Sequence, residues 1–298
     1  MAGGGPSRDR ILHIADLHFW RVVTNPLRLL NKRFLGNLNV LIRRRREFPM
    51  GRAESFIPGL TSTGIPTAVL TGDFTSTSTE EEFRLARRFV DALSRSGVTL
   101  RLLPGNHDVY TFEAQRNRRF ERHFPEFVPV GGGPWREDLA GGTPLVLVPT
   151  VCPNILTSRG RVTGETVAAV SRLLRQCTGP VLVAGHYPVL HRTREYRLGL
   201  SRRLGNAEAL RDALGASGQR ILYLAGHVHR FSYMRDPKYG NLDHLTTGAF
   251  FRENRREEIG GEFAEVHIRE DGFDVFRHTY RGMWSHSEVA VDTGRSGL

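Results

Sequence analysis

Residues 11–18 read ILHIADLH, a short apolar run that ends in Asp16 and His18. The run has the length and the branched aliphatic content of a buried strand rather than of a helix. Four further runs of this kind occur, at 67–71, 98–103, 181–184 and 221–225. Each of them is followed by polar residues, across a proline in the case of 98–103. This repeated pairing of a strand with a polar ending decides the fold.

The polar endings form five motifs with metal-binding side chains. They are Asp16-x-His18, Gly72-Asp73, Gly105-Asn106-His107-Asp108, Gly185-His186 and Gly226-His227-x-His229. In open α/β sheets, ligands bind beyond the carboxyl ends of the strands, so we expect these groups to meet at one rim. Imidazole and carboxylate groups without thiolate favour Mn, Fe, Zn or Co. The sequence therefore predicts a transition-metal site.

Helical patterns separate the predicted strands. They cover residues 78–96, 164–176 and 206–214. Strands that alternate with helices indicate a layered α/β domain. Segments 262–268 and 273–280 flank an Asp-Gly pair and predict an antiparallel hairpin, which we place at the end of a second sheet. With no internal repeat and no linker, residues 1–298 are interpreted as a single domain.

Composition indicates an ordinary globular protein. The chain has 298 residues, enough for a sizeable core. Its two cysteines, Cys152 and Cys177, have no metal-binding spacing, which suits a reducing compartment. The first residues lack the apolar stretch of a signal peptide, and no run is long enough for a spanning helix. From these features we expect a cytoplasmic protein.

The net charge of +11 is unevenly distributed. Nine arginines and lysines but only one glutamate lie between residues 19 and 52, so about +8 belongs to this segment. Residues 26–46 have leucine and phenylalanine at helical spacing, with basic residues on the rest of the surface. They predict a basic amphipathic helix, part of an insert at about 20–58.

Three interpretations of the predicted helix stay open. It packs on the domain and exposes a basic face, or it contacts an anionic membrane peripherally, at the inner face. Contact with nucleic acid is the least favoured, because aromatic side chains suited to base stacking are sparse around the helix.

With all five motifs present in order from Asp16 to His229, the sequence resembles the calcineurin-like metallophosphoesterase superfamily, and within it the bacterial cyclic-nucleotide phosphodiesterase branch. The resemblance implies a four-layer αββα sandwich of two mixed sheets flanked by helices. It also implies two divalent or mixed-valence transition-metal ions, of a kind that the sequence does not specify.

The resemblance further implies a role for each motif residue. Asp16, His18 and His229 would bind one metal; Asn106, His186 and His227 would bind the other; Asp73 would bridge them. A hydroxide held between the metals would attack phosphorus. His107 would assist the leaving group, and Asp108 would orient His107.

The function that we expect is hydrolysis of a phosphoric ester, with a phosphodiester such as a cyclic nucleotide favoured over a monoester. One alternative is a lipid-linked pyrophosphate hydrolase that resembles the UDP-diacylglucosamine hydrolases and acts at a membrane surface on a lipid-linked diphosphate. A non-catalytic interaction scaffold is the other. Outside the motifs, we expect His13 to pack in the first strand. Tyr187 and His191 are candidates for the lining of the substrate pocket, although this role is the less favoured interpretation of both.

Overall fold

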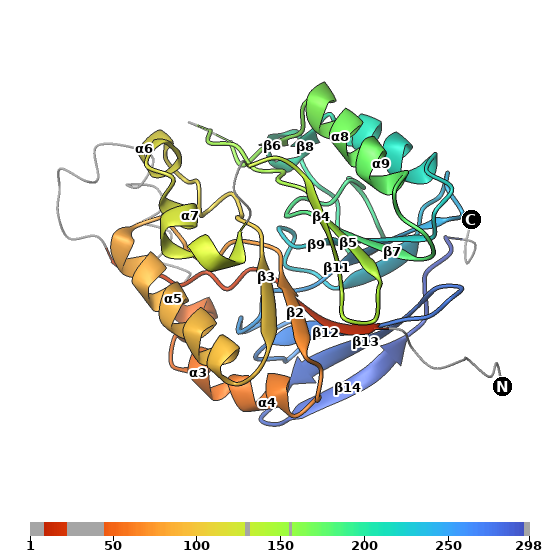
Figure 1. Cartoon of the computed structure of the whole chain (residues 1–298). Helices are drawn as coiled ribbons and strands as arrows, with labels where there is room; N and C mark the ends of the chain where they lie inside the picture. Colours follow the sequence, from red (N-terminus) through yellow and green to blue (C-terminus); the bar gives the residue numbers. More distant parts are fainter. Residues whose placement is uncertain (1–8, 23–44, 129–131, 155–156, 295–298) are drawn as a thin grey trace.

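The computed structural model describes residues 9–22, 45–128, 132–154 and 157–294. Within them, two six-stranded sheets pack against each other, and helices cover the outer face of each sheet (Figure 1). One apolar cluster lies between the sheets and contains Ile11 and Val69 from one and Leu182 and Leu222 from the other. Two further clusters lie between a sheet and its helices. The predicted four-layer α/β architecture is confirmed.

The first sheet combines the N-terminal strands with the C-terminal hairpin. Its order is β14 (Trp284–Val289), β13 (Phe273–Tyr280), β12 (Glu262–Ile268), β1 (Asp9–Ile14), β2 (Thr67–Leu70) and β3 (Thr99–Leu102). Strands β1, β2 and β3 are parallel, whereas β12 is antiparallel to β1. The hairpin of β12 and β13 forms as predicted. Its predicted place at the end of a second sheet was wrong, because Ile11 pairs with Val266 and so joins the hairpin to β1.

The second sheet has a parallel centre and antiparallel edges. Its order is β10 (Ser232–Arg235), β11 (Leu242–Thr246), β9 (Ile221–Ala225), β7 (Val181–Ala184), β5 (Pro144–Leu147) and β4 (Trp135–Asp138). Every residue of β5, β7, β9 and β11 is buried. Covered on both faces, β7 and β9 read as continuous apolar runs, which is why the sequence predicts them. Strands β5 and β11 were not predicted, and β11 contains the polar residues Asp243 and His244. A separate parallel pair, β6 (Gly160–Arg161) and β8 (Leu204–Gly205), lies beside this sheet.

Three longer helices match the predicted patterns. They are α5 (Glu80–Arg95), α8 (Gly164–Leu174) and α9 (Ala207–Gly215). The short helices are α2 (Arg45–Glu47), α3 (Arg52–Ser55), α4 (Ile57–Thr61), α6 (Phe112–Arg116), α7 (Arg119–His123), η3 (Pro125–Phe127) and η4 (Leu200–Arg202). Helix α5 packs on the first sheet through Phe83, Phe89 and Leu93, whereas Val170 of α8 and Leu210 of α9 pack on the second.

The N-terminus of α5 is fixed by a reciprocal pair of hydrogen bonds. The Thr79 hydroxyl accepts from the backbone N–H of Glu82 at 3.3 Å, and the Glu82 carboxylate accepts from the backbone N–H of Thr79 at 3.2 Å. Glu82 is buried and also accepts from the backbone N–H groups of Thr77 and Arg21. Burial raises the pKa of this carboxyl group, and the hydrogen bonds from the backbone N–H groups act against this effect by stabilising the charged carboxylate. This capping box joins α5 to the loop that follows β2.

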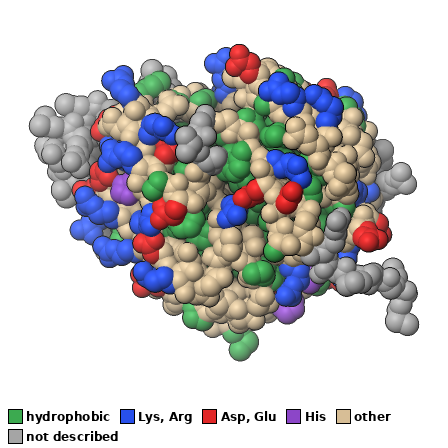
Figure 2. Space-filling model, viewed as in Figure 1, with side chains coloured by type: hydrophobic (Ala, Val, Ile, Leu, Met, Phe, Trp, Pro, Cys, Tyr) green, Lys and Arg blue, Asp and Glu red, His purple; other side chains and the backbone are tan. Residues whose placement is uncertain are grey.

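The predicted amphipathic helix at 26–46 lies almost entirely outside the described residues, as does most of the predicted insert. The described parts of the insert contact each other: the Trp20 indole N–H donates to the Phe48 carbonyl oxygen at 2.9 Å. Elsewhere on the surface, basic side chains gather over α5 and α7 and again over α8 and α9 (Figure 2). Within the described part of the chain, no helix has the length and apolar composition needed to cross a membrane.

Replacing Thr79 with alanine removes one half of the capping box. We expect Thr79→Ala to lower the free energy of unfolding by about 1 kcal/mol, the usual loss for an N-cap threonine. Denaturant unfolding followed by circular dichroism measures it. Arg88→Ala, on the exposed face of α5, is the matched control and should change stability by less than about 0.5 kcal/mol. Equal stability of both variants would show that the cap contributes nothing.

Candidate metal centre

Hydrogen bonds between strands continue past the strand ends into the motif loops. The backbone N–H of Asp16 donates to the Gly72 carbonyl oxygen at 3.0 Å, and that of His18 donates to the Asp73 carbonyl oxygen at 2.7 Å. In the second sheet, the N–H of Gly226 donates to the carbonyl oxygen of His186 at 3.0 Å. The motif loops are therefore held by the same ladders as the strands.

Five of the predicted metal ligands have left-handed backbone conformations. Asp16, His18, Asp73, His227 and His229 have φ values of 56°, 50°, 56°, 69° and 52°. Only four other non-glycine residues have positive φ in the part of the chain that the structure describes. Such conformations cost free energy and persist where the surrounding structure imposes them. Their concentration in the motif loops marks the carboxyl ends of the strands as a functional site.

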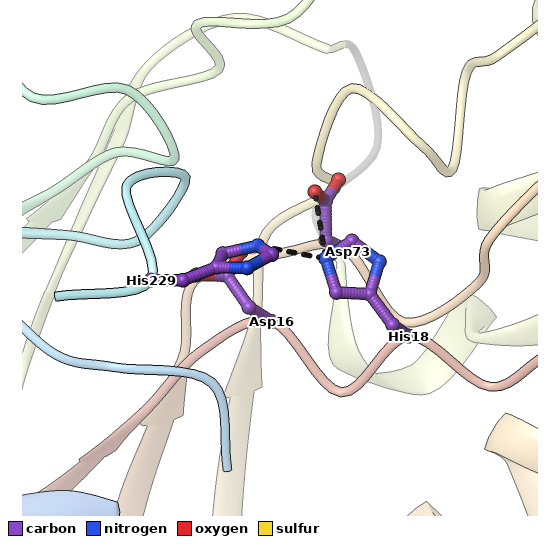
Figure 3. A group of neighbouring side chains, drawn as sticks. All are labelled: Asp16, His18, Asp73 and His229. Carbon is purple, nitrogen blue, oxygen red and sulfur yellow. Dashed lines mark hydrogen bonds and ion pairs between the residues drawn. The ribbon is translucent and has the colours of Figure 1, made fainter. Parts of the chain in front are cut away.

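The first donor group contains Asp16, His18, Asp73 and His229 (Figure 3). One ligand atom from each of these residues lies within 4.8 Å of all the others. Nδ1 of His18 lies 3.3 Å from the Thr75 carbonyl oxygen, which can only accept, so Nε2 carries the lone pair. That nitrogen is 2.9 Å from Nε2 of His229. The two imidazoles and two carboxylates thus point at one position that could hold a metal ion.

The second donor group is built around Asn106, His186 and His227. Nδ1 of His186 lies 2.7 Å from the Thr71 carbonyl oxygen, so its Nε2 lone pair faces Asn106 Oδ1 at 3.1 Å. Nε2 of His227 lies 2.9 Å from the Arg202 carbonyl oxygen, so its Nδ1 lone pair faces the same Asn106 oxygen at 2.9 Å. Three acceptor atoms converge here without a proton between them.

Burial keeps both of these imidazoles neutral. It lowers the pKa of His186 to about 4, and it lowers the pKa of His227 well below its usual value, with the positive charge of Arg202 adding to the effect on His227. A neutral imidazole is the form that binds a metal. Converging lone pairs repel one another unless a cation lies between them, so the residues present fit a second transition-metal ion.

Asp73 lies between the two donor groups. Its Oδ2 is 3.6 Å from Nε2 of His18 in the first group, and its Oδ1 is 3.5 Å from Nε2 of His186 in the second. Oδ1 also accepts a hydrogen bond from the backbone N–H of His107 at 2.7 Å. One carboxylate therefore faces both groups, in the position that a bridging ligand requires.

Gly72 and Gly105 allow the motif loops to approach each other closely. Gly72 has φ +96°, and a Cβ atom there would lie 2.6 Å from the Cα atom of Gly105 and 2.8 Å from Nδ1 of His186. A Cβ atom on Gly105 would collide with the backbone and carboxylate of Asp73. A side chain at Gly72 would therefore displace His186, and one at Gly105 would displace Asp73.

His107 lies beside the first donor group and is held by a backbone carbonyl. Its ring packs edge-on against the His18 ring, with the centroids 4.9 Å apart, and stacks on Tyr110. Its Nδ1 is 2.6 Å from the Ser76 carbonyl oxygen, so Nδ1 carries a proton and Nε2 is the nitrogen suited to proton exchange. The side chain is partly exposed, as a group that meets a substrate must be.

Asp108 does not orient His107 in the way that we predicted. Its buried carboxylate accepts hydrogen bonds from the backbone N–H groups of Phe74, Thr75 and Gly105 and from the Thr75 hydroxyl. Burial raises the pKa of this carboxyl group to about 7, and the negative charge of Asp73 adds to the effect. Asp108 thus fixes the loop that carries the Ser76 carbonyl, and any influence on His107 is indirect.

Three residues outside the motifs, His13, Tyr187 and His191, occupy different environments in the structure. His13 is buried in β1, as predicted, with Nε2 2.9 Å from the Thr71 hydroxyl. Tyr187 is fully buried, its ring centroid is 4.2 Å from that of His227, and its hydroxyl donates to the Ser158 carbonyl oxygen. Tyr187 therefore packs against His227 in the interior and does not line an open pocket. His191 is half-buried, and nothing in the structure assigns it to a substrate.

Sequence reasoning missed the groups that orient the histidines. They are the backbone carbonyls of Thr71, Thr75, Ser76 and Arg202. Every residue has a backbone carbonyl, so no residue type in the sequence marks these positions.

The calcineurin-like phosphoesterase family matches residues 9–231 of the chain. A search of curated proteins found no match.

Solved structures show the same fold at low sequence identity. A dimetal phosphatase from Danio rerio is 13% identical, with a TM-score of 0.64, over 95% of this chain and 100% of that one. A purple acid phosphatase from yellow lupin seeds is 13% identical, with a TM-score of 0.54, over 95% of this chain and 54% of that one. A 5'-nucleotidase from Candida albicans is 16% identical, with a TM-score of 0.53, over 96% of this chain and 51% of that one. The chain spans about half the length of the last two.

Removing one ligand from each donor group tests whether both bind metal. We expect the wild-type chain to bind about two manganese ions, and His229→Ala and Asn106→Ala to bind about one each, because each variant damages only one group. Elemental analysis after gel filtration measures the stoichiometry. His286→Ala, which removes an exposed histidine of β14, is the control and should keep the wild-type value. Wild-type metal content in both ligand variants would contradict the assignment.

Proposed function

The chain belongs to the calcineurin-like phosphoesterase family, and from this premise we propose that it is a dinuclear metal-dependent phosphodiesterase. Membership of the family implies hydrolysis of phosphoric esters. The observation that carries the proposal is the pair of donor groups that share Asp73, with His107 beside them. Within this proposal, residues 1–298 form one catalytic domain.

We assign Asp16, His18 and His229 to one ion, Asn106, His186 and His227 to the other, and Asp73 to both. When bound, two such ions supply an activated water and positive charge for the phosphoryl oxygens. The chain keeps its donors in place before an ion binds, because backbone carbonyls fix the tautomers of His18, His186 and His227. The absence of thiolate in either group supports manganese, iron, zinc or cobalt over a structural zinc site.

His107 is proposed as the residue that assists departure of the leaving group. The Ser76 carbonyl holds the proton on Nδ1, so a second proton on Nε2 can be donated to the leaving oxygen. Backbone hydrogen bonding of His107 to Asp73 ties the position of this ring to that of the bridging carboxylate. His107 and the two metal-binding groups therefore keep fixed positions relative to each other.

Two candidate substrate classes follow from different observations. The order of the five motifs favours a phosphodiester, with cyclic nucleotides as the first to be screened. The phosphatases and the nucleotidase with the same fold make a monoester the main rival, although identity of 13–16% to them speaks only for the fold. A scaffold without activity is disfavoured, because the described residues include all seven proposed ligands and His107.

The role of His107 predicts a specific kinetic defect. His107→Ala should lower kcat by about 10²–10⁴-fold, the usual contribution of a positioned general acid, and leave the metal content at the wild-type value. Turnover of a nitrophenyl phosphodiester, measured beside elemental analysis of the same sample, separates the two effects. Met283→Ala, far from the site in an exposed turn, is the control. Unchanged turnover in His107→Ala would refute the role.

A pair of nitrophenyl substrates tests the substrate class. We expect manganese-loaded protein to hydrolyse the phosphodiester faster than the matching monoester, and chelation with EDTA to abolish both activities. Restoring the activity with added manganese would show that chelation had not unfolded the chain. Faster hydrolysis of the monoester would contradict the phosphodiesterase assignment while leaving the family unchanged.

A further inference from the structure

Large exposed hydrophobic side chains are rare in the described part of the chain. There are three of them: Phe112, Leu200 and Met283, with exposed fractions of 52%, 74% and 74%. Single exposed hydrophobic residues are common on soluble proteins, so their number alone says little. Their positions are informative, because two of the three lie on loops that also carry groups of the metal centre.

Phe112 is tied to the His107 side of the centre. It is the first residue of α6, and the preceding residue, Thr111, caps that helix by accepting from the backbone N–H of Ala114 at 3.2 Å. Tyr110, one position earlier, stacks on the ring of His107 with the centroids 5.3 Å apart. The exposed ring of Phe112 is thus held a short chain segment away from the proposed proton donor.

Leu200 is tied to the second donor group. It begins the single turn η4, which ends at Arg202. The Arg202 carbonyl oxygen accepts from Nε2 of His227 at 2.9 Å, and the Arg202 guanidinium donates to the His227 carbonyl oxygen at 3.3 Å. These two contacts fix the turn, and with it the exposed leucine, to a proposed metal ligand.

Exposed arginines accompany both hydrophobic side chains. Arg116 and Arg118 lie close to Phe112 in sequence, and Arg197 and Arg202 lie close to Leu200; all four are exposed. Neighbouring carboxylates are already engaged, since Glu113 pairs with Arg119 at 2.9 Å and Glu195 accepts from the Ser232 hydroxyl at 3.1 Å. We call Phe112, Leu200 and these four arginines the apolar-basic rim.

The rim lies at one end of the molecule. Figure 1 shows α6 and β8, the strand that begins two residues after η4, at the end toward which the parallel strands carry the motif loops. Met283 is at the opposite end: it precedes Trp284, which packs on Phe56 with ring centroids 4.8 Å apart, next to α4. The chain therefore offers a matched exposed hydrophobic residue that is remote from the rim.

We propose that the apolar-basic rim seats the metal centre against an anionic lipid bilayer, so that the chain acts on phosphoesters of lipid headgroups. Hydrophobic side chains that enter the headgroup region and arginines that meet anionic lipids contribute together to such binding. A phosphoester held in the bilayer would be brought close to the donor groups, because the segments of Phe112 and Leu200 both contact groups of the metal centre. This inference rests on the proposed phosphoesterase function and names its substrate class.

Sedimentation with vesicles tests the rim directly. Metal-loaded full-length protein is mixed with vesicles of phosphatidylcholine alone or of phosphatidylcholine with phosphatidylglycerol, at roughly 0.1 M salt. We expect wild type and Met283→Ser to sediment with the anionic vesicles, and Phe112→Ser/Leu200→Ser to bind roughly tenfold more weakly. Phe112→Trp/Leu200→Trp should keep or strengthen binding, which shows that loss in the serine variant is not caused by misfolding.

The outcomes separate this inference from the proposed function. Binding requires no turnover, so an inactive protein can still confirm the rim, and hydrolysis of a soluble nitrophenyl ester tests the centre alone. Equal sedimentation of wild type and the serine variant would overturn the proposal and direct attention to residues 26–46. No sedimentation of wild type, or equal sedimentation with both kinds of vesicle, would overturn it as well.

Discussion

The interaction on which the site depends is the hydrogen-bond ladder that continues past the ends of the parallel strands. It links Asp16 to Gly72 and His18 to Asp73, so two loops that are far apart in sequence are held together. Five proposed ligands at the strand ends have left-handed conformations, and the packing of the buried strands beneath them supplies the stability that offsets this strain.

Orientation of the histidines follows one rule throughout the centre. In His18, His107, His186 and His227, one ring nitrogen is engaged by a backbone carbonyl, which leaves the other for metal or substrate. Carbonyls belong to the rigid loops, so the tautomer of each ring is set by the fold and not by another side chain. Asp108 serves the same end indirectly, because it fixes the loop from which the Ser76 carbonyl comes.

The electrostatics of the centre favour a cation over any neutral arrangement. Burial keeps His186 and His227 uncharged, and their lone pairs face the Asn106 oxygen. Buried acceptors without donors are costly, so the fold carries a local free-energy penalty that metal binding would remove. Specificity for a substrate must then come from the surroundings, which here include hydrophobic residues and arginines on the loops around the donors.

The sequence by itself determined the five strands that precede the motifs, the three longer helices, the hairpin and the residues whose side chains meet at the centre. These follow from local periodicity and from residue types with one dominant chemistry, such as the Asp-x-His and Gly-His-x-His motifs. Only the tertiary structure decided that the hairpin joins β1, that Asp108 supports a loop and not His107, and that Tyr187 lies behind His227. Strand pairing, backbone carbonyls and burial depend on contacts between distant segments, and such contacts have no signature in the local sequence.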